Sequence, residues 1–360
     1  MIRISIDAMG GDHAPREVVH GSVLAALEYK IAILLVGPED LIREELNRPV
    51  IKQLLGGKDP ASHHISVVHA SEVVQMHEKP SWSVVKKKDS SIVVATKLVR
   101  EGKADGLVSA GSTGAAAVAA QICLGKVENV DRCAIACTMP TIHDRPCFLI
   151  DAGASVSWDA HQMLQLGLMG TILAKGLYNI TNPRVGILNI GTEDSKGTDV
   201  VKEANLLFRK NESKMNYIGF VEGRDYPLGK VDVVVTDGFT GNVSLKTAEG
   251  IARMMTFMLR EELMGSLKGR VAGVIGKTAL KNLKARVNQD EFGGALLVGI
   301  KGVCVIAHGG SKHTAIKNAI RVAKDMVAAH VVDKIESVLA TTGKNGNGAE
   351  AIELKGKDKK

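Results

Sequence analysis

Short, strongly apolar runs alternate with longer amphipathic segments along almost the whole chain. The apolar runs suit strands covered on both faces, and the longer segments suit helices. The alternation therefore predicts a three-layer α/β fold, with a mostly parallel sheet and helices on both faces. Strands are predicted at 2–6, 32–36, 65–69, 106–109, 147–151, 185–189, 217–221 and 231–236, and helices at 15–29, 91–101, 114–124, 159–175 and 198–210.

Glycine-rich loops follow the predicted strands. They read "DAMGGDHAP", "SAGSTG", "IGTEDSKGTD", "TDGFTGN" and, in the C-terminal part, "AHGGS". Small residues let the backbone approach a ligand closely, and a helix start offers unpaired N–H groups that favour an anion. Because ligands bind at the carboxyl ends of parallel strands, we expect all five loops to converge on one rim.

The chain is expected to divide into parts. Residues 1–150 with 295–340 would form a core α/β domain, 151–294 a second α/β region, and 341–360 a disordered polar tail. The segment 248–287 differs from the rest because an apolar stripe is followed by a basic stretch. The stripe contains Ile251, Met254, Met255, Met258 and Leu259, and the basic residues are Lys268, Arg270, Lys277, Lys281, Lys284 and Arg286. Such a segment can pair two copies, lie on an anionic membrane or meet an acidic protein.

Composition narrows the class of protein. Five cysteines without a CxxC pair favour free thiols in a reducing compartment, and no metal site is expected. Aromatic residues make up only 3% of the chain, so stacking surfaces for nucleic acid are scarce. No leader peptide is visible, and the uncharged span 106–125 is interpreted as a strand, a loop and a buried helix rather than a membrane span. The sequence thus predicts a cytosolic protein that does not bind nucleic acid.

Four residues outside the "SAGSTG" loop could carry chemistry. Lys196 lies among glycines, where a cation can meet a phosphate or a developing oxyanion. Asp237 could cap the following helix or act in catalysis, and Asn242 could donate to a carbonyl oxygen. His308 follows an apolar strand beside two glycines. The loops lack both the P-loop lysine and a G-x-G-x-x-G fingerprint, so neither ATP hydrolysis nor dinucleotide binding is indicated.

The order of six motifs resembles that of PlsX-type phosphate acyltransferases. These are "ISIDAMGGDHAP", "SAGSTGA", "IGTEDSKG", "TDGFTGNV", "EFGGALLVGIKG" and "AHGGS". The resemblance implies a fold similar to phosphate acetyltransferases and to isocitrate and isopropylmalate dehydrogenases. It also implies reversible transfer of a long fatty acyl group from acyl carrier protein to inorganic phosphate, with no cofactor, for phospholipid synthesis. A cytosolic homodimer at the inner face of the membrane, serving a downstream membrane acyltransferase, is implied as well.

Site roles follow from this resemblance together with the loop chemistry. The phosphate would be held by Ser109, Gly111, Ser112, Thr113 and Gly114, with Gly10 and Gly11 of the first loop. Lys196 would neutralise charge, Asn242 would donate to the carbonyl oxygen, and either His308 or Asp237 would manage the proton of the leaving thiol. Alternatives are a short-chain enzyme that uses coenzyme A, a non-catalytic phosphate- or nucleotide-binding regulator and, third, a dehydrogenase.

Overall fold

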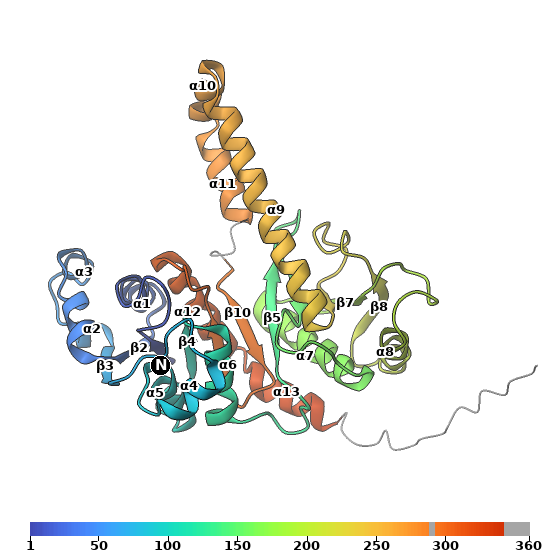
Figure 1. Ribbon diagram of the computed structural model, residues 1–360, viewed down its shortest axis with the longest axis horizontal. Helices are drawn as coiled ribbons and strands as arrows, with labels where there is room; N and C mark the ends of the chain where they lie inside the picture. The colour runs from blue at the N-terminus through green and yellow to red at the C-terminus, as the bar shows by residue number, and fades with distance from the viewer. Residues whose placement is uncertain (288–291, 342–360) are drawn as a thin grey trace, which may run out of the picture.

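A single mixed sheet runs through the fold in the computed structural model, which describes residues 1–287 and 292–341 (Figure 1). Within these residues the sheet has eleven strands, which include all eight that the sequence predicts. Their spatial order is β3 (Ile65–His69), β2 (Ala32–Gly37), β1 (Arg3–Asp7), β4 (Gly106–Ser109), β11 (Val303–Ile306), β10 (Ala295–Val298), β5 (Ala134–Met139), β6 (Cys147–Ile150), β9 (Val233–Val235), β7 (Arg184–Leu188) and β8 (Asn216–Val221).

The sheet contains two parallel groups that run in opposite directions. Strands β3, β2, β1, β4 and β11 are mutually parallel, and so are β6, β9, β7 and β8. Between the groups, β10 and β5 are antiparallel to both of their neighbours, which reverses the direction. The prediction of one common rim is therefore wrong. The loops after β1, β4 and β11 share one edge, whereas those after β7 and β9 leave from the opposite edge.

Helices cover both faces of the sheet. One face carries α1 (Arg16–Tyr29), α2 (Glu39–Leu46), α3 (Pro49–Leu54), α7 (Ala160–Tyr178), α8 (Asp199–Lys210), α12 (His313–Ala328) and α13 (Val331–Ala340), and a short 3₁₀ turn (Pro60–His63) precedes β3. The other face carries α4 (Pro80–Lys86), α5 (Ser91–Arg100), α6 (Thr113–Leu124) and the first turns of α9 (Gly238–Met264). This arrangement confirms the predicted α/β class.

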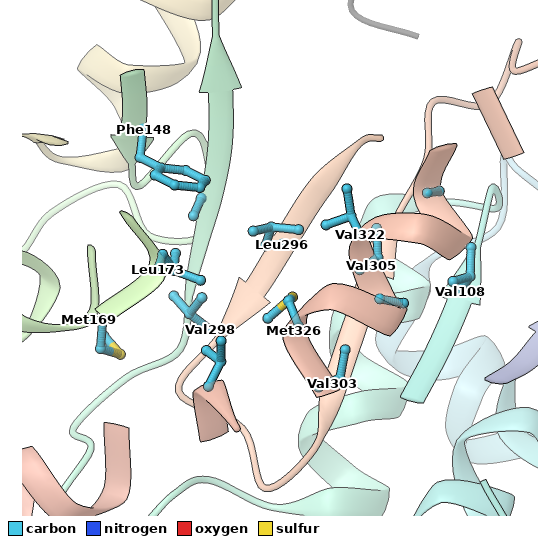
Figure 2. Close-up of a cluster of buried hydrophobic side chains, with 14 of the residues drawn as sticks. Val108, Phe148, Met169, Leu173, Leu296, Val298, Val303, Val305, Val322 and Met326 are labelled. Carbon is cyan, nitrogen blue, oxygen red and sulfur yellow. The ribbon is translucent and has the colours of Figure 1, made fainter. Parts of the chain in front are cut away.

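Alternate side chains of the central strands pack into two hydrophobic cores, one on each face of the sheet. Figure 2 shows Leu296 and Val298 of β10 and Val305 of β11 on the face that packs against Val322 and Met326 of α12. The intervening residues of these strands point to the other core, under α6 and α9. This period of two explains why the strand runs are almost wholly apolar.

A helical arm projects from the body of the protein. It consists of the outer part of α9, followed by α10 (Leu267–Ile275) at the tip and α11 (Lys277–Val287), which returns beside α9 toward the body (Figure 1). The buried residues of α9 are Gly238, Gly241 and Leu245, all at its start, and α10 has none. At the base of the arm, Arg286 donates to the Ile142 carbonyl at 2.7 Å. The predicted amphipathic segment 248–287 is therefore this arm.

Three further expectations concern the uncharged span, the C-terminal tail and the domain boundaries. The uncharged span 106–125 is β4, a loop and α6, as predicted, and no helix among the described residues is long and apolar enough to cross a membrane. The predicted disordered tail lies, apart from Thr341, outside the described residues. The sheet is continuous across the predicted domain boundaries, so the domain division stays a prediction.

Candidate active site

Three loops meet where β1, β4 and β11 end side by side. Asp7, Ser109 and Ile306 lie in one row across these strands. The Asp12 amide donates to the Gly309 carbonyl, and the Ala307 amide donates to the Ser109 carbonyl, both at 2.8 Å. Since residues 198 and 297 positions apart in the chain are joined by backbone hydrogen bonds, these loops form one unit.

Gly10 permits the closest approach between two of these loops. A Cβ atom on Gly10 would lie 2.7 Å from the Gly111 amide nitrogen and 2.7 Å from Asp7 Oδ2. Gly11, with φ of 104°, would place a Cβ 2.9 Å from the Gly309 carbonyl oxygen. Because only glycine fits at both positions, the predicted pair Gly10 and Gly11 has a defined structural role in this junction.

A buried carboxylate braces the "SAGSTG" loop from below. The Ser109 hydroxyl donates to Asp7 Oδ2 at 2.7 Å and accepts from the Gly111 amide at 3.0 Å. Burial raises the pKa of the Asp7 carboxyl above its usual range, against the effect of the Ser91 and Ser109 hydroxyls. Ser109 is only 1% exposed, and its proton is used by Asp7. The structure therefore places Ser109 beneath the loop as a brace, and its predicted contact with phosphate stays a prediction.

The start of α6 presents the remaining residues of this loop. Ser112 is the N-cap, and its hydroxyl accepts from the Ala115 amide at 3.5 Å. Thr113 follows as the first helical residue, is exposed, and lines a cavity of about 900 Å³. Gly114 lies against Pro80, since a Cβ on Gly114 would approach Pro80 Cγ to 2.7 Å. At Thr113 the start of α6 therefore meets the cavity. Its unpaired backbone N–H groups can donate hydrogen bonds to an anion bound there.

His308 stands at the same cavity, in the loop after β11. Its side chain is exposed to the cavity, and Nδ1 accepts from the Gly310 amide at 3.1 Å. A neutral imidazole that accepts at Nδ1 carries its proton on Nε2. The ring can therefore donate a proton from Nε2, which suits the role predicted for it.

Helix α9 forms the opposite wall. Asn242, Lys246, Arg253 and Arg260 all line the cavity, and Lys246 Nζ lies 3.0 Å from a carboxylate oxygen of Glu249. Of these residues, the sequence had singled out only Asn242. Lys246, Arg253 and Arg260 precede the basic stretch that begins at Lys268, which stands out in the sequence. Their spacing of seven residues, which puts them on one helix face, could have indicated them.

Asp237 caps α9. Its Oδ1 accepts from the Thr240 amide at 2.8 Å, and its Oδ2 accepts from the Thr240 hydroxyl at 2.7 Å. This confirms the capping alternative. Both carboxylate oxygens are occupied in the cap, so the geometry favours His308 over Asp237 for proton transfer.

Lys196 is not brought into this group. It is exposed in the loop after β7, at the edge of the sheet opposite to the three joined loops, and it is not among the residues that line the cavity. Its amide donates to Glu193, and the Asn189 side chain donates to its carbonyl at 3.2 Å. Its role at the phosphate therefore stays a prediction.

Asp151 organises the floor beneath α9, and the sequence did not indicate it. This fully buried carboxylate accepts from the amides of Gly153, Ala154 and Ser155 and from Trp158 Nε1, at 2.7 to 3.1 Å. These hydrogen bonds offset the cost of burying the polar side chain. It fixes the loop against which Gly238 and Gly241 of α9 pack.

The fold belongs to a known structural class. Of the solved structures, a phosphotransacetylase from Streptococcus pyogenes superposes with a TM-score of 0.62 at 14% identity, covering 92% of this chain and 94% of that one. The EutD phosphotransacetylase from Staphylococcus aureus superposes with a TM-score of 0.58 at 16% identity, over 91% and 94% of the two chains. The chain therefore has the phosphotransacetylase fold.

The sequence matches define the family. A family model described as "Fatty acid synthesis protein" matches residues 2–334. A phosphate acyltransferase from Pelotomaculum thermopropionicum is 44% identical over 98% of this chain and 99% of its own length, and one from Heliobacterium modesticaldum is 44% identical over 94% and 100%. The chain belongs to this phosphate acyltransferase family of fatty acid and phospholipid synthesis, as the motifs predict. It is therefore an enzyme, which excludes the non-catalytic alternative.

Proposed function

We propose that the enzyme transfers a long-chain fatty acyl group reversibly from the thioester of acyl carrier protein to inorganic phosphate. The observation that carries this proposal is the start of α6, which the contact of Gly10 with Gly111 positions at the edge of a large cavity with a cationic wall. Backbone amides and a helix start suit a small oxyanion, and the cavity is large enough for a thioester next to it.

The reaction needs positioning more than a protein nucleophile. A phosphate oxygen attacks the thioester carbonyl carbon, the C–S bond breaks, and the electron pair leaves with sulfur. We assign Thr113 and Gly114, at the start of α6, to the phosphate and the Asn242 amide to the carbonyl oxygen. The phosphate proton passes to the departing thiolate, to which His308 Nε2–H donates a hydrogen bond, so the products are an acyl phosphate and a free thiol.

The cysteine that lines the cavity is not suited to nucleophilic catalysis. Burial raises the pKa of Cys137 to about 12, so its thiolate is scarce near neutral pH. Direct attack by phosphate, without a covalent acyl-enzyme, agrees with this environment.

The test of this function is direct. Purified protein is mixed with palmitoyl-acyl carrier protein and phosphate, and both free carrier thiol and acyl phosphate are measured. We expect stoichiometric formation of the two products, with palmitoyl-coenzyme A a poor donor. Preferential turnover of acetyl- or butyryl-coenzyme A would instead support the short-chain alternative.

We also propose that the arm pairs two copies of the chain and meets an anionic surface at the inner face of the membrane, where a downstream membrane acyltransferase would receive the product. The arm bears large apolar side chains with no covering layer among the described residues, and Leu267, Val274 and Ile275 are at least 75% exposed. Lys268, Arg270, Lys277 and Lys281 lie on the same two helices, α10 and α11, as does Lys284 by its position in the chain. Apolar and basic groups together favour a headgroup region or an acidic carrier protein.

These partners are separable by experiment. Charge reversal at Lys277, Lys281 and Lys284 is followed by measurement of both carrier-protein affinity and sedimentation with anionic vesicles. Loss of vesicle binding alone assigns the basic surface to the membrane, and loss of carrier affinity alone assigns it to the carrier. Sedimentation equilibrium of the full chain tests the dimer, and a monomer at micromolar concentration would contradict it.

A further inference from the structure

Three cations form a ladder along the cavity wall of α9. Lys246, Arg253 and Arg260 are spaced by seven residues, and all three line the cavity. Seven residues are nearly two helical turns, so the side chains leave the same face about 10 Å apart. The ladder therefore runs lengthwise along the cavity from the sheet toward the arm.

Lys246, the first of these three cations, lies level with the three joined loops. Cys137 occupies the same row of the sheet as Ala295, Ile306 and Ser109. The charges of Glu249 and Lys246 act on the Cys137 thiol, which places this turn of α9 beside that row. Lys246 thus stands near the loops, while Arg260 lies about 21 Å further along the helix.

Arg253 and Arg260 differ from Lys246 in their ion pairing. Lys246 is paired with Glu249, but neither Arg253 nor Arg260 has an ion-pair partner among residues 1–287 and 292–341. Both guanidinium groups belong to a wall that also carries Thr256 and Phe257. Guanidinium groups bind phosphate oxygens in a bidentate geometry, so this wall offers a second anion site remote from the loops.

We propose that Arg253 and Arg260 bind the phosphodiester of a phosphopantetheine thioester, with Arg260 as the principal contact. This proposal rests on the proposed function, which places the thioester carbonyl at the three loops. A pantetheine chain is about as long as five residues of extended peptide, or about 17 Å. From the level of Lys246, this length reaches past Arg253 to within the side-chain reach of Arg260. The same phosphate is a phosphodiester in acyl carrier protein and part of a pyrophosphate in coenzyme A, and in both it offers oxygens to a guanidinium group.

Paired substrates test the site independently of general activity. Dodecanoyl-pantetheine and dodecanoyl-phosphopantetheine differ only in the phosphate, and kcat/KM is measured for each with inorganic phosphate as acceptor. The wild type should prefer the phosphorylated thioester by about tenfold to hundredfold. Arg260→Gln should remove most of this preference and Arg253→Gln part of it, where the preference is the ratio of the two kcat/KM values within each variant. Arg43→Gln, which removes the same charge from an exposed position on α2, should retain the preference.

The outcomes separate the two proposals. An unchanged preference in both Arg253→Gln and Arg260→Gln would overturn the phosphodiester site. If wild-type protein turns over neither thioester, the acyl-transfer proposal fails, and calorimetric binding of phosphopantetheine against pantetheine then decides the site alone. Acyl-coenzyme A and acyl carrier protein should be affected equally by Arg260→Gln. An effect confined to the carrier protein would contradict phosphodiester recognition, because it would indicate a protein contact.

Discussion

Gly10→Ala tests whether the close contact of two loop backbones creates the phosphate site. The added Cβ would lie 2.7 Å from both Asp7 Oδ2 and the Gly111 nitrogen and 3.0 Å from Ser109 Oγ. None of these atoms is the free end of a flexible side chain, because Asp7 and Ser109 are buried and hydrogen-bonded to each other. Overpacking of this kind typically costs about 1–3 kcal/mol of unfolding free energy.

The functional effect follows from the displaced amide. The Gly111 N–H donates to Ser109 Oγ and so fixes the loop that leads into α6. If displacement of this loop costs the phosphate one charge-assisted hydrogen bond at the start of α6, the KM for phosphate should rise by about tenfold or more. Urea unfolding followed by circular dichroism gives the stability, and initial rates at varied phosphate give the KM. The thioester KM should change much less, since the cavity wall on α9 is not touched.

A matched glycine provides the control. Gly250 lies in α9, and a Cβ built there meets no atom within 4 Å. Gly250→Ala should therefore raise stability by about 0.5–1 kcal/mol through helix propensity and leave the phosphate KM unchanged. Wild-type stability in Gly10→Ala would refute the packing argument. Lower stability with a wild-type phosphate KM would refute the placement of phosphate at this junction.

Three further predictions concern charge and burial. From its predicted role, Lys196→Ala should slow turnover roughly a hundredfold without changing the Tm, and a near-wild-type rate would remove Lys196 from the mechanism. Cys137 should resist iodoacetamide at pH 8 in the folded protein because burial raises its pKa to about 12, and rapid labelling there would contradict the buried setting. Burial raises the pKa of Asp232, but hydrogen bonds from Arg184 and its charge outweigh this effect and hold the pKa below its usual range. The pair therefore stabilises the folded protein at any pH above the pKa of Asp232 in the unfolded chain. This stability is lost as the pH falls through the lower pKa of Asp232 in the folded protein. Asp232→Asn should lower the free energy of unfolding by about 1.5–3 kcal/mol at pH 7 and make this free energy depend less steeply on pH in the acid range. If the variant shows the same dependence on pH as the wild type, this pair does not cause it.

The strands were predictable because their local pattern is strong. Two of them, β3 and β4, have the bounds that the sequence predicts, and the others differ by one or two residues at an end. Strand β5 has the sequence "AIACTM" and was not predicted, because small and polar residues weaken its apolar run. For β10 and β11 the sequence predicts only an apolar strand before His308, without bounds, although Gly299, with φ of 88°, marks the turn between the two strands.

The reversal within the sheet had a signal in the sequence that was not used. Only four residues connect β10 to β11, and seven connect β5 to β6. A parallel crossover needs a dozen or more residues, so both connections require antiparallel pairs. The rule gives two of the three antiparallel pairs. The third pair joins β10 to β5, which are far apart in the chain, and without it the two reversals would cancel and leave one common rim.

The site was predictable only where it is local. Helix caps such as Ser112 and Asp237 depend on their immediate neighbours, so their roles could be anticipated. The contact of Gly10 with Gly111 joins residues that are distant in sequence, and only the pairing of β1 with β4 brings them together. Likewise, Arg260 reaches the cavity because α9 crosses the sheet and continues beyond it, a path that no local pattern specifies.

Helix α9 connects the site to the arm physically. It is fixed at its start, where the Gly238 amide donates to the Ser155 carbonyl at 2.8 Å and where Gly241 packs against the Asp151 backbone. Beyond Leu245 the described helix has no buried residue, so its outer part is not held by the sheet. One side of that outer part lines the cavity with Arg253 and Arg260, while large apolar side chains elsewhere on it are exposed. Whatever covers the apolar side chains therefore also orients the cationic wall, and binding at the arm and binding of the thioester donor must be coupled through this single helix.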